Sequence, residues 1–165
     1  MKLHHLAIIA LILLTAFATQ ASPPTPSVTI SAINVSVNIV EFPLTETCWA
    51  IQPWETAVGH LEGTTGLGQN GNIVLAGHSR MPDGKPGIFS GLHQLTEGDE
   101  IVVFDGAVER RYVVSQVFTV PKKDVSVVFP TSHEQLTLIT CDTGSYNRSK
   151  DVYDRRVVVV ANPAN

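Results

Sequence analysis

Short runs of alternating polarity, separated by turn signals, are the feature that most constrains the fold of this chain. Val28 and Ile30 alternate with polar residues, and the alternation continues on the opposite parity from Ile33 to Ile39. A period of two predicts strands, and the change of parity predicts a break or bulge between two of them. Beyond the N-terminal segment no run keeps an apolar period of 3.6 residues, so we expect a mainly β domain.

Further segments along the chain have the β-branched, apolar character of strands. Glycine-containing turn signals lie between them, such as Gly98-Asp99 and Asp105-Gly106. One short helix is expected around 88–92 and a helical turn around 132–135. Strands this short and frequent are compatible with a barrel or a sandwich. The predicted strands are 72–76, 100–104, 111–120, 136–140 and 156–161.

Size and composition favour one globular domain. The chain has 165 residues, of which 44% are hydrophobic and 16% charged, which is enough for one real core and too little for two. The formal net charge is -4, and the lysines and arginines are scattered. Because nucleic-acid binding normally needs a basic stripe or patch, we expect no nucleic-acid partner.

The N-terminus predicts export. The apolar run LAIIALILLTAFA spans about 13 residues, against the ~20 that a membrane span needs, and is typical of a signal-peptide core. We therefore expect a signal peptide or short membrane anchor over 1–21, a proline-rich linker over 22–27 and the folded domain over 28–165. The predicted location is extracytoplasmic, at the cell envelope, either secreted or held to the membrane by an uncleaved N-terminal segment.

Two cysteines allow two interpretations. In an exported protein, Cys48 and Cys141 would form a disulfide closing a loop of about 90 residues. Against this, Cys141 ends a predicted strand and begins a polar loop, where the backbone is fixed and the side chain can meet a substrate. A thiol with an ordinary pKa near 8.5 is a weak nucleophile at neutral pH, so such a cysteine needs a nearby base or positive charge.

His78 and one of two arginines are the matching candidates. His78 also follows an apolar strand, and Gly77 before it permits close approach of backbone or substrate. Arg155 and Arg156 begin the last predicted strand, and a positive group there could stabilise an oxyanion. Adjacent strand residues face opposite sides, so only one arginine can serve the site. The histidines interpreted as structural or surface residues are His60, His93 and His133.

Three segments resemble the catalytic segments of sortases. They are TLITC at 137–141, NIVLAGH at 72–78 and YDRRVVVVA at 153–161, and they occur in the family's order. The resemblance runs from about Val28 to the C-terminus. It implies an eight-stranded sortase β-barrel and a thioacyl-enzyme mechanism without a cofactor. The family's spacing between the arginine and the small residue that ends its strand, here Ala161, selects Arg156 over Arg155.

The resemblance also implies roles and partners. Cys141 would attack a peptide carbonyl in an LPxTG-like C-terminal sorting signal of a surface protein, and Arg156 would bind the substrate or the oxyanion. His78 would protonate the leaving amine and then deprotonate an incoming amine from a cell-wall precursor or a pilin lysine. Thr140 is a candidate substrate-binding residue or an ordinary β-branched strand residue. No metal is predicted, and scattered surface carboxylates are assumed at Glu41, Glu46, Glu55 and Glu62.

Three alternatives to a sortase remain. They differ from it in the acceptor of the second reaction step, in enzyme family or in having no enzymatic activity. A cysteine peptidase would share the thioacyl intermediate and pass it to water. The L,D-transpeptidase type places His-Gly directly before its cysteine, whereas Ile139 and Thr140 precede Cys141 here, which disfavours it. A non-enzymatic extracellular β domain that binds surface polymers would require a disulfide between Cys48 and Cys141.

Overall fold

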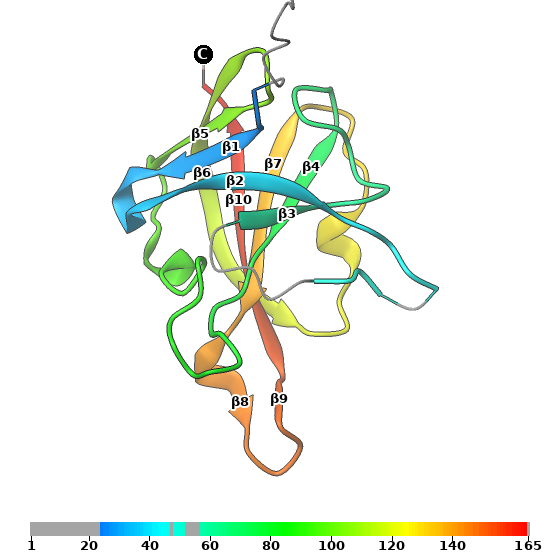
Figure 1. Cartoon of the computed structure of the whole chain (residues 1–165), viewed down its shortest axis with the longest axis vertical. Coiled ribbons are helices and arrows are strands. Elements are labelled where there is room, and N and C mark those ends of the chain that lie inside the picture. The colour runs from blue at the N-terminus through cyan, green and yellow to red at the C-terminus, as the bar shows by residue number, and fades with distance from the viewer. Residues whose placement is uncertain (1–23, 47, 52–56, 165) are drawn as a thin grey trace, which may run out of the picture.

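The computed structural model describes residues 24–46, 48–51 and 57–164 (Figure 1). Eight strands close into a barrel in the order β1-β2-β3-β4-β7-β10-β6-β5. This confirms the predicted mainly β fold with a closed barrel of about eight strands. The barrel strands are β1 (Ser27–Ile30), β2 (Val35–Phe42), β3 (Ala57–Leu61), β4 (Asn72–Ala76), β5 (Glu100–Phe104), β6 (Glu109–Pro121), β7 (Gln135–Cys141) and β10 (Arg155–Pro163).

The other elements are short. A separate hairpin projects between β7 and β10, and Figure 1 shows it at the end of the molecule opposite the C-terminus. Among the described residues, no helix has the length and apolar character needed to cross a membrane. The predicted N-terminal segment over 1–21 lies outside the described residues, as does Glu55. The remaining elements are β8 (Tyr146–Asn147), β9 (Val152–Tyr153) and the 3₁₀ helices η1 (Ser31–Ile33), η2 (Leu92–Gln94), η3 (Ser126–Val128) and η4 (Thr143–Ser145).

The break predicted between the first two strands is η1. Its turn is closed by Asn34, whose backbone N–H donates to the Ser31 carbonyl at 3.1 Å and whose φ is 55°. Asparagine tolerates this left-handed conformation better than most residues. The turn therefore reverses the chain, and β1 and β2 pair antiparallel.

Both predicted helical segments are misplaced. Residues 88–91 form turns, and the 3₁₀ helix η2 begins only at Leu92. Residues 132–134 form no helix, and Gln135 already belongs to β7. Its backbone N–H donates to the Gly71 carbonyl at 2.8 Å, so pairing beside β4 extends the strand where the local sequence is compatible with a helical turn.

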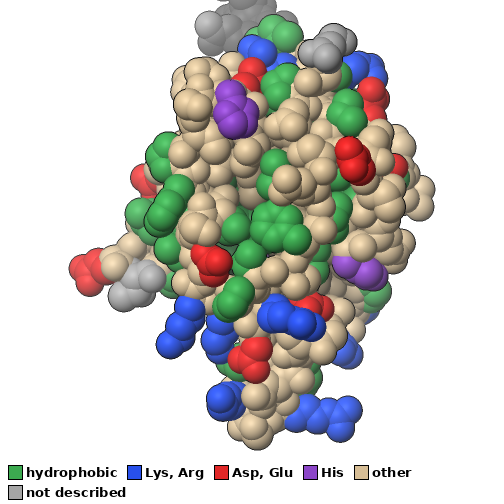
Figure 2. Space-filling model, turned by 180° about the vertical axis from the view of Figure 1, so that it is seen from behind, with side chains coloured by type: hydrophobic (Ala, Val, Ile, Leu, Met, Phe, Trp, Pro, Cys, Tyr) green, Lys and Arg blue, Asp and Glu red, His purple; other side chains and the backbone are tan. Residues whose placement is uncertain are grey.

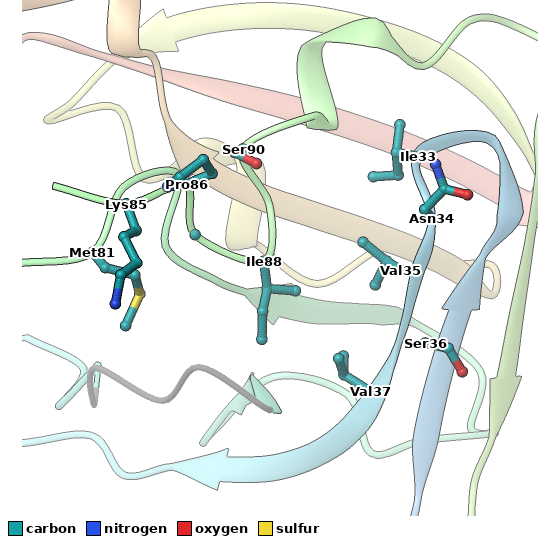
Figure 3. Close-up of a pocket in the computed structure, with 11 residues that line it drawn as sticks. Ile33, Asn34, Val35, Ser36, Val37, Met81, Lys85, Pro86, Ile88 and Ser90 are labelled. Carbon is teal, nitrogen blue, oxygen red and sulfur yellow. The ribbon is translucent and has the colours of Figure 1, made fainter. Parts of the chain in front are cut away.

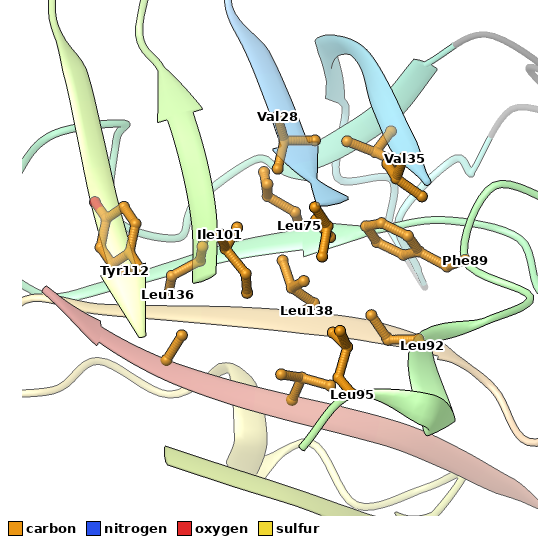
Figure 4. Close-up of a cluster of buried hydrophobic side chains, with 14 of the residues drawn as sticks. Val28, Val35, Leu75, Phe89, Leu92, Leu95, Ile101, Tyr112, Leu136 and Leu138 are labelled. Atoms are coloured by element: carbon orange, nitrogen blue, oxygen red, sulfur yellow. The ribbon is translucent and has the colours of Figure 1, made fainter. Parts of the chain in front are cut away.

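Inward-facing side chains of every barrel strand form the main core. Leu75, Ile101, Leu136 and Leu138 are each fully buried, and Phe89 closes the core from the connection after β4 (Figure 4). These residues follow the alternation of their strands, since odd and even positions face opposite sides of a barrel wall. The wall that carries them therefore fixes which side chains point outward.

A second, smaller apolar group covers part of the outer face of the barrel. We call it the outer-face cluster, and it consists of Phe42, Leu61, Val74 and Ala76. Partly buried Val128 and Ile139 pack against it, as does Trp49. Near their C-terminal ends β4 and β7 are therefore apolar on the outer face as well, through Val74, Ala76 and Ile139. This matters for the site because its residues continue these strands.

Candidate active site

Cys141 is the last residue of β7 and faces outward. Leu136 and Leu138 of the same strand point into the core, so the alternation places Ile139 and Cys141 on the outer side of the wall. The Cys141 side chain is half-buried. A sulfur at this position is held by the ladder and remains reachable from outside.

Strand register distinguishes the two arginines. Arg156 on β10 is the direct antiparallel partner of Cys141, so their side chains lie on the same face. One Arg156 N–H group donates to the Tyr153 carbonyl at 3.0 Å. Arg155 faces the other way, and its Nε lies 3.0 Å from Asp142 Oδ2. The geometry therefore favours Arg156 as the positive group of the site.

His78 reaches the site through the parallel pairing of β4 and β7. Ala76 pairs with Ile139, and the Gly77 N–H donates to the Ile139 carbonyl at 3.2 Å, so the ladder continues past the end of β4. His78 is two residues beyond Ala76, as Cys141 is beyond Ile139. The two side chains are therefore expected at the same level, on the outer face.

The imidazole of His78 has an available nitrogen. Its Nε2 is buried and has no hydrogen-bond partner among the described residues. The following connection folds back over it, since the Phe89 N–H donates to the His78 carbonyl at 3.0 Å. Gly87 permits this close approach, because a Cβ there would lie 2.2 Å from the His78 carbonyl oxygen. A buried polar atom without a partner calls for a functional explanation, and proton exchange with a substrate is one that fits a histidine.

Thr140 joins the two strand ends. Its side chain is 4% exposed, and its hydroxyl donates to the Gly77 carbonyl at 2.8 Å. It also lines the cavity beside Cys141. The hydroxyl therefore holds the residue before His78 to the residue before Cys141, a local role that sequence reasoning missed.

The electrostatics of Cys141 are a balance of two opposing effects. Burial raises the pKa of the thiol above its ordinary value, and the positive charge of Arg156 opposes that rise without cancelling it. Attack on a carbonyl requires the thiolate, so the site needs a group that removes the proton, and His78, just beyond the neighbouring strand β4, is the candidate.

Two cavities lie on this part of the molecule, and one of them borders Cys141. One, of about 320 Å³, is bordered by Cys141, Asp142 and Thr119, and also by His93, which is exposed. Sequence reasoning placed His93 on the surface without linking it to this cavity. The other, of about 460 Å³, lies between η1–β2 and the segment 81–90 (Figure 3). Ser90 borders both cavities.

Basic side chains gather toward the end of the molecule with the β8–β9 hairpin. Figure 2 shows most of the Lys and Arg side chains of that face near this end. Lys122 lies there, with Nζ 3.6 Å from Asp154 Oδ1, close to the base of the hairpin. The chain as a whole carries a formal charge of -4, so these basic side chains are a local concentration of positive charge.

The remaining cysteine, histidine and glutamate candidates from the sequence do not join this site. Cys48 and Cys141 are not joined by a disulfide, which contradicts the interpretation as a disulfide-stapled domain. His60 Nδ1 lies 2.8 Å from Glu41 Oε2, in a pair whose carboxylate is exposed. Glu62 accepts from the Leu44 N–H at 2.7 Å. No group of three or more His, Cys, Asp or Glu that could hold a metal occurs in the described part of the chain.

The fold and the strand pairings together define a class: closed β-barrel proteins in which a cysteine ends one strand, an arginine on one neighbouring strand pairs with it, and a histidine follows the other neighbouring strand. The chain belongs to the sortase family, because the family model for the sortase domain matches residues 28–164.

Curated relatives share part of their sequence with this chain. Sortase A of Bacillus anthracis is 37% identical over 71 residues, which is 43% of this chain and 33% of that protein. Sortase A of Listeria monocytogenes is 33% identical over 72 residues, 44% of this chain and 32% of that protein. The matched region thus spans about a third of the length of these relatives.

Solved structures share the fold. Sortase A of Listeria monocytogenes superposes with a TM-score of 0.67 at 23% identity, covering 87% of this chain and 89% of that one. Sortase C1 of Streptococcus agalactiae gives 0.68 at 24% identity, covering 90% and 71%. A Clostridium perfringens sortase D5 transpeptidase gives 0.66 at 24% identity, covering 86% and 79%. At these identities the likeness shows a common fold.

Proposed function

We propose that this protein is a sortase-type cysteine transpeptidase that acts at the cell envelope. It cleaves a C-terminal, LPxTG-like sorting signal of a surface protein and transfers that protein to an amine acceptor. The observation that carries the proposal is the meeting of three strand ends: Cys141 on β7, its register partner Arg156 on β10, and His78 just beyond β4.

The first half-reaction forms a thioester. His78 takes the proton of the Cys141 thiol, and the sulfur attacks the scissile carbonyl of the sorting signal. The oxyanion that develops is stabilised by the Arg156 N–H groups not used by backbone carbonyls. The C–N bond then breaks, His78 returns its proton to the leaving amine, and the acyl group remains on sulfur.

The second half-reaction releases the product. An incoming amine, from a cell-wall precursor or a pilin lysine, attacks the thioester carbonyl, and His78 removes a proton from its nitrogen. The new amide bond forms as the C–S bond breaks, and the sulfur leaves as thiolate. The cavity of about 320 Å³ that borders Cys141 supports the proposal, since a substrate needs room near the sulfur.

The test is incubation of the protein with a labelled LPxTG-type peptide, with and without an amine such as triglycine, followed by mass spectrometry. We expect an amine-dependent ligated product, no turnover by Cys141→Ala and most of the turnover by Cys48→Ala. Product that never contains the amine would favour a hydrolytic cysteine peptidase. Equal loss in both cysteine variants would contradict the assignment of the nucleophile.

A further inference from the structure

A buried amide on the outer face of the barrel links β4 and β7 to the segment between β6 and β7. Asn72, the first residue of β4, is 2% exposed. Its amide nitrogen donates to the carbonyls of Val127 and Phe129, both at 3.0 Å. Its amide oxygen accepts from the Thr137 hydroxyl at 2.6 Å and from Gln135 Nε2 at 3.3 Å. Both donors and both lone pairs of the amide are therefore used.

The strand position of Asn72 shows which face of the barrel this network occupies. Asn72 has the parity of Val74 and Ala76, so it faces outward, where an apolar residue would pack as Val74 does. A buried amide is costly unless it is fully hydrogen-bonded. Unlike a hydrophobic side chain, this amide forms hydrogen bonds to the two carbonyls that flank Val128.

Val128 connects the network to the candidate site. It belongs to η3 and packs against the outer-face cluster, as Ile139 does. Ala76 of that cluster precedes His78 by two residues on the same face, and Ile139 precedes Cys141 by two. Val128 therefore lies as a wall beside the apolar strip of Ala76 and Ile139, and this strip leads to His78 and Cys141.

We propose that Asn72, supported by the Thr137 hydroxyl, is a positioning residue that holds η3 as one wall of the peptide-donor site. The inference rests on the proposed function. Asn72 does not touch the reacting atoms. It fixes the backbone on both sides of Val128, and the donor peptide lies against that side chain.

The main test variant is Asn72→Asp, which keeps the size of the side chain and removes both amide donors. The two carbonyls then face a carboxylate. We expect KM for the labelled sorting peptide to rise about tenfold or more, because two buried hydrogen bonds are lost and tenfold corresponds to about the worth of one. We expect kcat to change by less than about twofold, since the lost interaction concerns binding only.

Matched variants separate positioning from general damage. Asn70→Ala removes a neighbouring amide that donates to the Ser132 carbonyl at 3.5 Å, outside η3, and should leave KM unchanged. Thr137→Val removes one donor to the Asn72 oxygen and should raise KM by less than Asn72→Asp does. In every variant the rate of Cys141 alkylation by iodoacetamide should match that of the parent protein, because the thiol site is intact.

A double-mutant cycle tests the route through η3. If Asn72 acts by placing Val128, Asn72→Asp should raise KM much less in a Val128→Ala background than alone. Amide hydrogen exchange over 126–129 should be faster in Asn72→Asp, independently of any substrate. Additive effects on KM would overturn the proposal, because they would mean that Asn72 acts elsewhere.

Three further outcomes would also decide whether Asn72 positions the donor site. Faster exchange over 126–129 with an unchanged KM would overturn the proposal, since the hold would exist without serving the donor. A fall in kcat and in alkylation together would show damage to the barrel and overturn it as well. If Asn72→Asp does not fold, Thr137→Val and Val128→Ala carry the KM comparison. If the parent protein has no activity on the peptide, the proposed function itself is contradicted. In an active parent, the outcomes above contradict only the role of Asn72.

Discussion

At the scale of single residues, the side chain opposite a cysteine on the neighbouring strand determines its electrostatic environment. Arg156 lies opposite Cys141, whereas the guanidinium of Arg155 is held by Asp142, whose side chain is 16% exposed. The two arginines are adjacent in sequence and chemically identical. Only the antiparallel register gives them different neighbours, and it favours the one that family spacing also selects.

The pH dependence of Cys141 alkylation tests this environment. Iodoacetamide reacts with the thiolate, so the rate rises as the thiol loses its proton. Because burial holds the pKa of Cys141 above the ordinary value, we expect the midpoint of the rate profile, measured in Cys48→Ala, to lie at higher pH than for N-acetylcysteine. Arg156→Gln removes the charge that lowers this pKa and should move the midpoint higher still.

Arg155→Gln is the matched control for the alkylation profile. Its guanidinium is paired with Asp142 and faces away from the thiol, so the midpoint should stay where it is in the parent. A midpoint below that of N-acetylcysteine, or an equal shift in both arginine variants, would contradict the arrangement described for the site.

At the scale of elements, the ends of parallel strands bring His78 and Cys141 to one level. The β4–β7 ladder runs from Asn72 to Ala76, and the Gly77 N–H extends it toward His78. The Thr140 hydroxyl adds a bond to the Gly77 carbonyl. Three successive links therefore place a histidine and a cysteine that are far apart in the chain.

Replacing Thr140 by valine removes the last of these links and keeps the shape of the side chain. The Gly77 carbonyl loses a partner, so we expect the free energy of unfolding to fall by about 1 kcal/mol in urea titrations. The histidine is then less well placed, and kcat for the sorting peptide should fall more than KM changes. Thr119→Val, at an exposed position on the same cavity, should affect neither. An unchanged kcat in Thr140→Val would show that this bond does not position His78.

The strands could be predicted where alternation or β-branching is strong. The bounds of β4 and β5 match the prediction, and β6, β7 and β10 extend one to two residues beyond it at each end. β3, with the sequence AVGHL, was missed because all five of its residues are buried and no alternation is visible. A Cβ at Gly59 would lie 1.9 Å from the Phe42 ring, so this glycine leaves room for a side chain from the next strand. A single strand carries no sign of such a neighbour.

At the scale of the whole molecule, one core links the strands that carry the site. Leu138 on β7 is fully buried between the barrel walls, on the strand that ends at Cys141. Val157 on β10 belongs to the same core and follows Arg156. Packing of the side chains inside the barrel therefore fixes the strands whose outer faces carry the site.

Leu138→Ala tests this dependence. A fully buried leucine truncated in a closed barrel should cost about 2–5 kcal/mol in the free energy of unfolding, measured by urea titration. Val113→Ala, on a side chain that is 36% exposed, should cost much less. A loss of similar size in both variants would contradict a core centred on Leu138.

The sequence by itself determined the local features of this protein. Alternation and β-branching determine most strands, and the motifs around His78, Cys141 and Arg156 are visible as short strings. The tertiary structure alone decided which residues meet, because pairing between distant strands is not encoded in any one segment. It made Arg156 the register partner of Cys141 and left Cys48 and Cys141 unbridged. It also placed the Asn72 amide against the Val127 carbonyl of η3, a contact that the motif around His78 does not reveal.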